Sequence, residues 1–441
     1  MSRTKRKPPP DTEFSAEVTD LDHDGRGVAR INGKVTFIFG ALPGETVRYK
    51  LLRVTRALDE AEVTAIDVAS PDRVTPGCEH FGLCGGCSLQ HLAPAAQIAF
   101  KQQAMLEALR RIGGVVPDVI ADAVTGPVWT YRRRARMGVK LVPKKGGVLI
   151  GFRERDANAL AVLNRCEVVD PRLGLKLRLL GALFDGLSIA GQIPQIEVSA
   201  AAHVAVTIRV LAPPSDDDRA KLLAFAAEHD YDFYLQSGGP DTLVPLSAAR
   251  PLDYSPDGSA LRLAFQPADF IQINSDVSQR MVVQALDWLG VEPGNEVLEL
   301  FAGLGNFTLP LAARGAKVTA VEGETGLVAR GKANLQANGY DGRFLKADLF
   351  KPDPKAEWLK HRYDLALIDP PRSGAKEILP MLAATKARRI VYVSCHPGTL
   401  ARDAGELVNT YGYRLTRAGV LDMFPHTTHV ESMALFERSS G

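Results

Sequence analysis

Three short turn motifs constrain the fold of this chain most, because each follows an apolar run of the kind that forms a buried strand. The motifs are a glycine-rich turn at residues 301–306 (FAGLGN), a proline turn at residues 369–372 (DPPR), and Cys395 at the end of the run 390–394. From about residue 267 onward, strand-like and helix-like segments alternate, which predicts an α/β domain with a mostly parallel, doubly wound sheet. Ligands bind such sheets at the carboxyl ends of the strands, so we expect the three turns to line one site.

Residues 13–70 predict a different, all-β architecture. Short β-rich runs are separated there by Gly, Asn-Gly and Pro-Gly turns, which is typical of a small five-stranded barrel of the OB type. Residues 1–12 are basic and proline-containing with no apolar stretch after them, and so predict a disordered tail instead of a signal peptide. Residues 71–266 mix strands and helices, including a helix over about residues 94–111, and residues 267–441 contain the α/β domain.

The composition is that of a globular protein with several domains, since 46% of the 441 residues are hydrophobic and 24% are charged. The net charge of +2, from 53 basic and 51 acidic residues, neither requires nor excludes binding to nucleic acid. No uncharged apolar run approaches the length of a membrane span, so we expect a cytoplasmic protein without a membrane partner. In that reducing compartment the five cysteines are expected to be metal ligands or nucleophiles and not disulfides.

A cysteine cluster predicts a metal centre in the middle region. Cys78, Cys84 and Cys87 have five and then two residues between them, and the glycines among them allow the backbone to wrap closely around a centre. Cys166 offers a fourth thiolate from further along the chain. Three close cysteines and a distant one favour a four-iron cluster, whereas structural zinc sites usually pair two short Cys-x-x-Cys units. Zinc, and a cysteine-rich turn without metal, are the alternatives.

The glycine-rich turn indicates a nucleotide-type cofactor. Gly303 and Gly305 allow the backbone to approach a ligand, and Glu322 ends the next strand-like run, where a carboxylate accepts hydrogen bonds from ribose hydroxyls. NAD and S-adenosylmethionine both fit these features. The Pro-Pro turn after Asp369 resembles the corresponding motif of class I methyltransferases and favours S-adenosylmethionine. Arg372 stands where enzymes that methylate adenine N6 have an aromatic residue, which argues against that reaction.

Cys395 is a candidate nucleophile for the methylation of a pyrimidine. C5 of a pyrimidine is a poor nucleophile until a thiolate adds to C6, after which a base must remove the C5 proton. Glu431 is the best candidate for that base, with His426 and His429 as rivals. The alternative for Cys395 is a buried structural cysteine, since free cysteines are among the most buried residues. The alternative for Glu431 is an ordinary solvated glutamate.

With these motifs in this order, the chain resembles the RNA uracil-C5 methyltransferases of the TrmA/RlmC/RlmD type, and most closely the RlmD branch, over nearly its whole length. The resemblance implies that the barrel is a TRAM domain, that Cys395 is the nucleophile and that Glu431 is the base. It implies a [4Fe-4S] cluster at Cys78, Cys84, Cys87 and Cys166, and S-adenosylmethionine contacts at Gln272, Phe301, Asn306, Glu322, Asp348 and Asp369. Two residues depart from the family pattern, because His396 replaces the usual Asn and Ala302 replaces a frequent Cys.

The resemblance also implies that the partner is RNA, namely 23S rRNA, and not DNA. It further implies that the protein is a monomer. A barrel combined with four cluster cysteines resembles the 23S enzymes, and residues 71–266 are then the iron–sulfur and central RNA-binding region. The basic stretch at residues 131–136 (YRRRAR) is expected to follow phosphates, or alternatively to be a solvated or ion-paired strand. Two other classes stay open: an RNA-binding protein with a decayed catalytic domain, and a DNA cytosine-C5 methyltransferase, which usually has proline where Ser394 stands.

Overall fold

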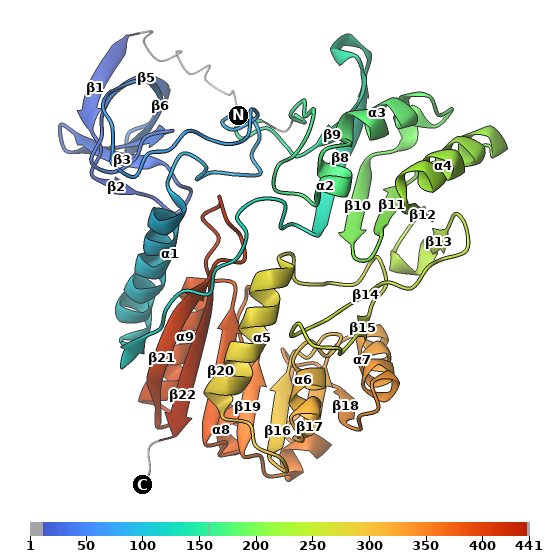
Figure 1. Cartoon of the computed structure of the whole chain (residues 1–441). Coiled ribbons are helices and arrows are strands. Elements are labelled where there is room, and N and C mark those ends of the chain that lie inside the picture. Colours follow the sequence, from blue (N-terminus) through green and yellow to red (C-terminus); the bar gives the residue numbers. More distant parts are fainter. Residues whose placement is uncertain (1–11, 158, 439–441) are drawn as a thin grey trace, which may run out of the picture. The chain divides into compact units, whose positions relative to one another are not determined.

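The computed structural model describes residues 12–157 and 159–438 (Figure 1). The disordered tail predicted for residues 1–12 lies outside these described residues except for its last member. Contacts between Cα atoms divide the chain into two compact units. The first unit combines the chain up to Ala99 with Arg153–Ala159 and Pro425–Thr428, and the second contains Phe100–Phe152, Leu160–Phe424 and the chain from His429 onward.

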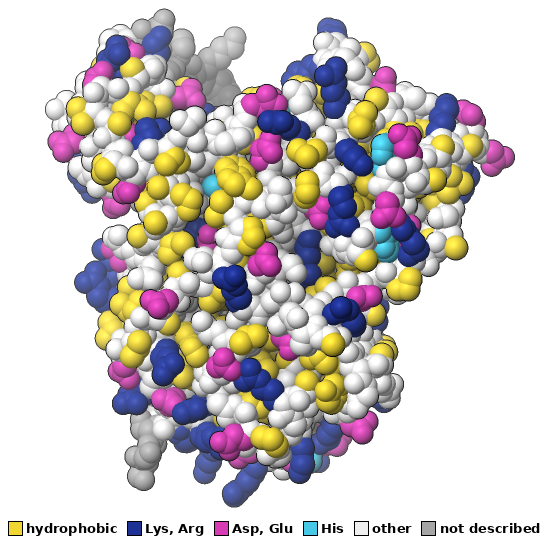
Figure 2. All heavy atoms as spheres, viewed as in Figure 1, with side chains coloured by type: hydrophobic (Ala, Val, Ile, Leu, Met, Phe, Trp, Pro, Cys, Tyr) yellow, Lys and Arg dark blue, Asp and Glu magenta, His cyan; other side chains and the backbone are white. Residues whose placement is uncertain are grey.

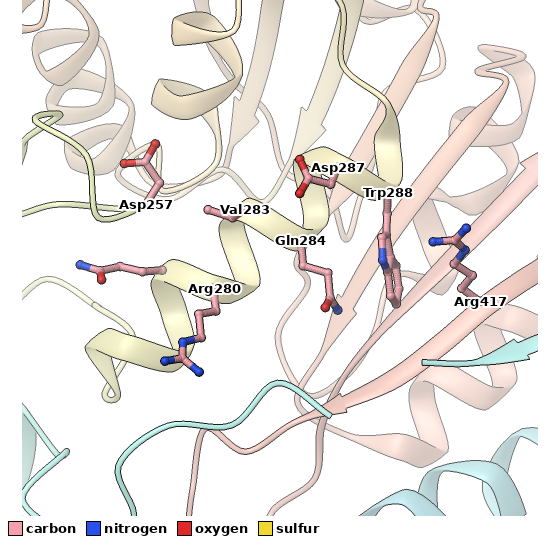
Figure 3. A pocket seen from close by; sticks show the side chains of 8 residues that line it. Asp257, Arg280, Val283, Gln284, Asp287, Trp288 and Arg417 are labelled. Atoms are coloured by element: carbon pink, nitrogen blue, oxygen red, sulfur yellow. The ribbon is translucent and has the colours of Figure 1, made fainter. Parts of the chain in front are cut away.

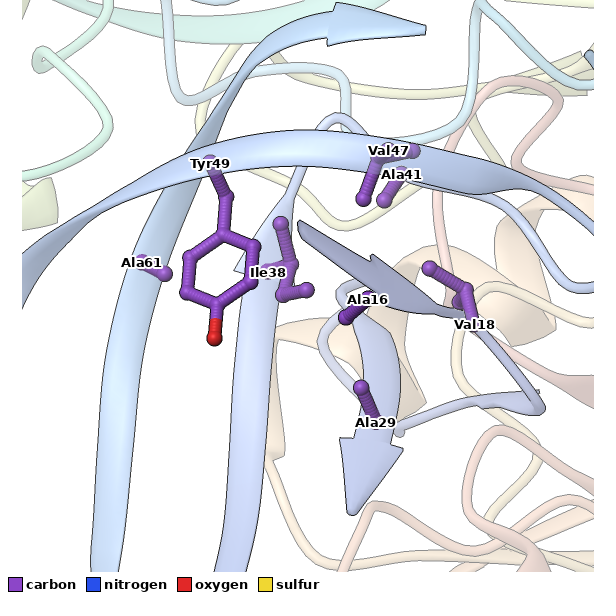
Figure 4. Close-up of a cluster of buried hydrophobic side chains, with 8 residues drawn as sticks. All are labelled: Ala16, Val18, Ala29, Ile38, Ala41, Val47, Tyr49 and Ala61. Carbon is purple, nitrogen blue, oxygen red and sulfur yellow. The ribbon is translucent and has the colours of Figure 1, made fainter. Parts of the chain in front are cut away.

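The first unit contains an all-β sheet whose strands are ordered β1-β5-β6-β4-β3-β2. The predicted all-β character is confirmed, although a two-residue strand, β2, adds a sixth member to the five expected. Ile38, Val47 and Tyr49 are the bulkier members of a core that is otherwise mostly alanine (Figure 4), so the strands can pack closely. The strands are β1 (Glu13–Glu17), β2 (Asp20–Leu21), β3 (Gly27–Ile31), β4 (Lys34–Phe39), β5 (Thr46–Val54) and β6 (Leu58–Val68).

The helix predicted over about residues 94–111 is confirmed as α1 (Pro94–Ala108) with a terminal π-helical turn, η1 (Leu109–Gly113). Proline at the first helical position needs no backbone donor there. Gly114 ends the helix in the left-handed region with a φ of 64°, and its N–H donates to the carbonyl of Leu109.

The second unit begins with a mixed sheet ordered β13-β12-β11-β10-β8-β9. β11 and β12 are parallel and nearly completely buried, and α4 connects them after a capping box between Ser215 and Asp218. The strands are β8 (Arg134–Val142), β9 (Gly147–Gly151), β10 (Gln195–Ala200), β11 (Val204–Arg209), β12 (Tyr231–Gln236) and β13 (Leu243–Pro245). The helices are α2 (Pro171–Gly174), α3 (Leu177–Asp185) and α4 (Asp216–His229).

The predicted doubly wound sheet follows in the same unit, with the strand order β18-β17-β16-β19-β20-β22-β21-β7. β16 to β20 are parallel and β22 is antiparallel to both of its neighbours. The strands are β7 (Val119–Ile120), β16 (Glu296–Leu300), β17 (Lys317–Glu322), β18 (Arg343–Lys346), β19 (Leu365–Ile368), β20 (Arg389–Ser394), β21 (Tyr413–Leu421) and β22 (Glu431–Arg438). The order reverses between β16 and β19, and such a switch point is where open α/β sheets bind ligands.

The helices of this sheet are α5 (Ser275–Leu289), α6 (Thr308–Ala313), α7 (Thr325–Ala337), α8 (Leu379–Ala384) and α9 (Pro397–Asn409). Short pieces complete the described chain: β14 (Asp253–Tyr254), β15 (Leu263–Ala264), η2 (Pro143–Lys145), η3 (Ala190–Gln192), η4 (Pro240–Thr242), η5 (Glu357–Lys360) and η6 (Lys376–Ile378). Among the described helices, none combines the length and the apolar character that crossing a membrane requires.

A buried ion pair fastens α1 to the end of β21 inside the second unit. The Lys101 ammonium lies 2.7 Å from a carboxylate oxygen of Asp422 and donates to the carbonyl of Phe424 at 2.9 Å. Lys101 is 1% exposed and Asp422 3%, so neither charge is solvated if the other is removed. Burial lowers the pKa of the Lys101 amine, and the neighbouring carboxylate of Asp422 opposes that shift.

We expect Lys101→Met to lower the free energy of unfolding by about 3–5 kcal/mol, because it leaves a buried carboxylate without a counter-charge. The double variant Lys101→Met/Asp422→Leu should recover most of that loss. Urea unfolding followed by fluorescence measures both, with Lys332→Met at an exposed position of α7 as the control. A midpoint for Lys101→Met equal to that of the control would contradict the expectation.

Candidate active site

The three turn motifs meet at one edge of the α/β sheet, as the sequence predicts. Parallel pairing sets Leu300 of β16 beside Val321 of β17 and Ile368 of β19, and Ile368 beside Tyr392 of β20. The residues that follow these strand ends are therefore neighbours along the same edge. They are Phe301 and the glycine-rich turn, Glu322, Asp369 and, after Ser394, Cys395.

The antiparallel strand β22 brings Glu431 to Cys395. Its ladder with β20 ends at the pair Ser394–Ser432, and Cys395 and Glu431 are the next residues beyond that pair. The Ser432 hydroxyl donates to the Ser394 carbonyl at 3.4 Å, which holds the two strand ends together. The Glu431 carboxylate is near enough to the thiol for its charge to raise the pKa of Cys395. Thiol and carboxylate thus come from distant segments of the chain to one place.

This edge of the sheet concentrates buried acidic groups. Burial raises the pKa of Asp369 to about 7. Burial, and then the charge of Asp369, raise the pKa of Glu431 to about 8. Burial, followed by Glu431 and Asp369, raises the pKa of the Cys395 thiol to about 11, and the guanidinium of Arg372 opposes this. A cationic ligand at this edge stabilises the ionised form of all three groups.

The glycine-rich turn is shaped for close approach to a ligand. Phe301, Gly303 and Gly305 have φ values of 63°, 55° and 93°, in the region that favours glycine. Glu322 is fixed beside it, because one carboxylate oxygen accepts from the N–H of Gly303 at 3.0 Å and the other from Gly323 at 2.7 Å. The second of these oxygens also accepts from the N–H of Glu324 at 2.9 Å, so it is the oxygen bonded to Gly303 that keeps a lone pair for a further donor, such as a ribose hydroxyl.

The remaining predicted cofactor contacts lie on the loops around this turn. Asn306 accepts a hydrogen bond from the Tyr254 hydroxyl at 3.1 Å. Asp348 follows β18 and accepts from the N–H of Phe350 at 2.9 Å, and the Phe350 ring lies 5.8 Å from that of Phe301. Gln272 is buried in the loop before α5.

His396 has a structural role that explains how it can replace asparagine. It is the N-cap of α9, and its Nδ1 accepts from the N–H of Thr399 at 3.2 Å, as an asparagine side chain does at this position. Nδ1 must be unprotonated to accept that bond. Burial, and then the charge of Arg372, lower the pKa of His396 and favour this neutral form.

The two rival bases differ in their surroundings. His426 belongs to the first unit, where its N–H donates to Gln97 at 2.8 Å and its carbonyl accepts from the N–H groups of Ser88 and Leu89. His429 belongs to the second unit, and its ring lies 5.2 Å from that of Phe424. Glu431 is the candidate base that the strand register sets opposite the thiol.

Sequence reasoning missed Glu299, a buried carboxyl on β16. It accepts from the Thr308 hydroxyl at 2.5 Å, and burial is the main reason that its pKa rises to about 8. Its only signal in the sequence is an acidic residue inside an apolar run. The expectation that residues 131–136 follow phosphates is wrong for Arg133, which is 8% exposed, and Arg134 and Arg136 both pair with Glu197.

No disulfide joins any of the five cysteines, all of which lie in the described part of the chain. Cys78, Cys84 and Cys87 lie in the first unit and Cys166 in the second. The N–H of Gly86 donates to the Cys84 sulfur at 3.4 Å, as happens around thiolates that bind a metal. In the described chain, one trio of ligand groups lies within 4.8 Å of one another, namely Asp22, His23 and Asp24, without any of the thiols. Four thiols, three of them close together in the sequence, are a donor set whose chemistry suits an iron–sulfur cluster.

A hollow of about 530 Å³ lies away from this chemistry, along the outer side of α5 (Figure 3). Arg280, Gln284, Trp288 and Arg417 are among its lining residues, and none of the predicted site residues is. The strand ends, and not this hollow, hold the reactive groups.

Comparison with known proteins agrees with the geometry. The model of the tRNA (Uracil-5-)-methyltransferase family matches residues 257–345 and 356–439, and that of the TRAM domain matches residues 12–64. The chain is 49% identical to the 23S rRNA (uracil(1939)-C(5))-methyltransferase RlmD of Alkalilimnicola ehrlichii, over 100% of both chains. It is 50% identical to RlmD of Xanthomonas axonopodis, over 97% of this chain and 98% of that one.

Among solved structures, the tRNA (uracil-54, C5)-methyltransferase of Pyrococcus abyssi, in complex with S-adenosyl-L-homocysteine, has the same fold. The TM-score is 0.72 at 22% identity, over 96% of this chain and 100% of that one. Fold and site define an S-adenosylmethionine-dependent methyltransferase of class I with an N-terminal TRAM domain. The chain belongs to the RlmD family of RNA uracil-C5 methyltransferases.

The charges at the site predict the reactivity of Cys395 in the free protein. At pH 9 both Glu431 and Asp369 are ionised, so Glu431→Gln or Asp369→Asn removes a negative charge that opposes the thiolate. Alkylation of Cys395 by iodoacetamide should therefore rise at lower pH in these variants than in the wild type, whose midpoint is near pH 11. Arg372→Met should move the midpoint upward. Peptide mass spectrometry follows Cys395 alone, and a shift of equal sign for all three variants would exclude this account.

Proposed function

We propose that this enzyme methylates C5 of a uridine in 23S rRNA, the one for which its relatives are named, and gives 5-methyluridine. The observation that supports this most is the pairing of Cys395 with Glu431 at the strand ends, beside the buried carboxyl of Asp369. Methylation at pyrimidine C5 needs a thiolate that adds to C6 and a general base that removes the C5 proton, and this pair can supply both.

In this mechanism Cys395 acts first and Glu431 last. Cys395 loses its thiol proton to solvent, its thiolate sulfur forms a bond to C6, and the electron pair of the C5–C6 double bond moves toward C5 and O4. When bound, S-adenosylmethionine would supply an electrophilic methyl group to C5, and the sulfur–methyl bond would break to leave S-adenosylhomocysteine. Glu431 then takes the proton from C5, the double bond forms again, and the thiolate leaves C6. A base with a pKa of about 8 is well matched to accept a proton near neutral pH.

We further propose that the loops around the glycine-rich turn bind the cofactor. Glu322 holds the ribose hydroxyls, and Asp369 faces the reacting end, where its negative charge favours a sulfonium. The other contacts are Gln272, Phe301, Asn306 and Asp348. The fixed carboxylate of Glu322 and the positive φ values of the turn support this assignment.

We propose that Cys78, Cys84, Cys87 and Cys166 hold a [4Fe-4S] cluster. The spacing of the first three and the N–H of Gly86 directed to the Cys84 sulfur support it. Methyl transfer to uracil needs no electron transfer, so the cluster serves structure or RNA positioning.

We propose that this enzyme acts on RNA and not on DNA. We also propose that it is a monomer. On the face of the molecule in Figure 2, basic and acidic side chains are interspersed, as the net charge of +2 leads one to expect. RNA recognition then rests on local contacts of the TRAM barrel and of the site and not on one large basic face.

The two catalytic residues should fail differently. Cys395→Ala should neither methylate nor form a covalent complex with RNA, because no bond to C6 can form. Glu431→Gln should add and methylate but release the product slowly, so a denaturant-resistant adduct accumulates. Gel electrophoresis with radiolabelled S-adenosylmethionine measures both, and substrate carrying 5-fluorouridine should trap the wild type in the same way.

DNA of the same sequence is the control for that assay and should accept no methyl group. Normal turnover by Glu431→Gln would show that another residue is the base, and His429 and His426 are the next to test. Methylation of uridine C5 by Cys395→Ala would overturn the mechanism.

Protein purified without oxygen should be brown and hold about four irons per chain. Cys84→Ser should lose both the colour and the iron, whereas Cys395→Ser should keep them, which makes it the matched thiol control. Iron analysis and absorption spectra measure this. Stoichiometric zinc without iron would exclude the cluster.

A further inference from the structure

Arg133 is a buried cation that the mechanism above does not use. It precedes β8, and its side chain is 8% exposed. Its Nε donates to the carbonyl of Gln272 at 2.7 Å, and its backbone N–H donates to the carbonyl of Ile273 at 2.9 Å. Arg133 therefore fixes the loop before α5 through both backbone and side chain.

The same guanidinium reaches the glycine-rich turn through one aromatic ring. It lies 4.2 Å from the centre of the Tyr254 ring, within the range of a cation–π contact. The Tyr254 hydroxyl in turn donates to Asn306 at 3.1 Å. Two residues proposed to contact the cofactor, Gln272 and Asn306, are thus held by one network with Arg133 at its centre.

Arg133 is buried without a counter-ion. In the part of the chain that the structure describes, no carboxylate forms an ion pair with it, and its Nη2 is buried without a hydrogen-bond partner. Burial lowers the pKa of the guanidinium, which shows the cost of holding this charge. A buried cation that lacks an anion attracts one strongly, because water screens the field poorly there.

The shape of the cofactor identifies which of its parts is the missing anion. The sulfonium carries three substituents: the methyl group, the ribosyl group and the amino acid chain. Phe301 and Asp348 meet at Phe350, where they can take the adenine. If the ribose binds Glu322 and the methyl faces Cys395, the third substituent then runs toward the remaining contacts, Gln272 and Asn306. At its end is the carboxylate, the only anionic group of S-adenosylmethionine.

We propose that Arg133 positions Gln272 and Asn306 for the amino acid end of the cofactor, and that its charge attracts the methionine carboxylate. This inference rests on the proposed cofactor site. It also gives the basic stretch at residues 131–136 a role other than phosphate binding. Arg133 is a positioning residue, and its charge acts on binding of the cofactor and not on the chemical step.

Two ligands separate this role from a general effect on the fold. S-adenosylhomocysteine has the amino acid chain, and 5′-methylthioadenosine lacks it but keeps adenine and ribose. By calorimetry on the full-length protein, Arg133→Met should weaken S-adenosylhomocysteine about tenfold or more and change methylthioadenosine by less than about twofold. Arg136→Met, three residues further on in β8 with a side chain 68% exposed, is the matched control and should change neither.

The other variants keep the test decisive. Glu322→Ala should weaken both ligands, and failure of the wild type to bind S-adenosylhomocysteine would remove the proposed function itself. Equal losses of both ligands, or none, in a folded Arg133→Met would overturn the inference alone. If Arg133→Met does not fold, Tyr254→Phe, which loses only the hydroxyl bonded to Asn306, carries the same test: it should weaken S-adenosylhomocysteine selectively, and equal effects on both ligands would overturn the inference.

Discussion

The register between β20 and β22 is the constraint on which the active site depends. Each strand is fully or nearly buried, so its alternating side chains fix which residues face each other. A slip of one residue would turn Glu431 to the opposite face of the sheet and leave Cys395 facing a neighbour without a carboxylate. The bond between Ser432 and Ser394 lies directly beside this pair and secures it. A strand that enters the sheet antiparallel, from the end of the chain, thus delivers the base to a thiol on a parallel strand.

The second organising feature is a group of buried carboxyls at a poorly hydrated edge of the sheet. Glu299, Asp369 and Glu431 are buried close enough to raise each other's pKa or that of Cys395. Such a group of carboxyls is costly for an empty site, since like charges in low dielectric repel strongly. In the proposed cofactor site, a sulfonium offsets that repulsion, whereas the neutral thioether left after methyl transfer does not. The proposed site therefore favours the methyl donor over its product, and it does so at the strand ends where the parallel sheet opens.

The sequence predicts the parts of this architecture that depend on local patterns. Apolar runs ended by Gly303, Asp369 and Cys395 are strand ends because buried parallel strands have that pattern, and the structure confirms their common edge. Patterns of this kind do not say which residue of one strand faces which residue of another. The closeness of Cys395 and Glu431 therefore became visible only in the strand pairing of the structure. Such patterns also do not distinguish a solvated arginine from a buried one. Arg133 stands among four arginines, and only the loop packed over it makes it different from Arg136.

Cys395, the proposed nucleophile, is a weak acid in the free protein, because burial and the charges of Glu431 and Asp369 raise the pKa of its thiol. Activation then requires a change in the surroundings and not in the residue. In the proposed cofactor site, a bound sulfonium adds positive charge beside Asp369, and both carboxyls become less repulsive to a thiolate. In that arrangement, binding of the methyl donor and activation of the thiol are coupled by electrostatics, so that Cys395 becomes most reactive when a methyl group is present to be transferred.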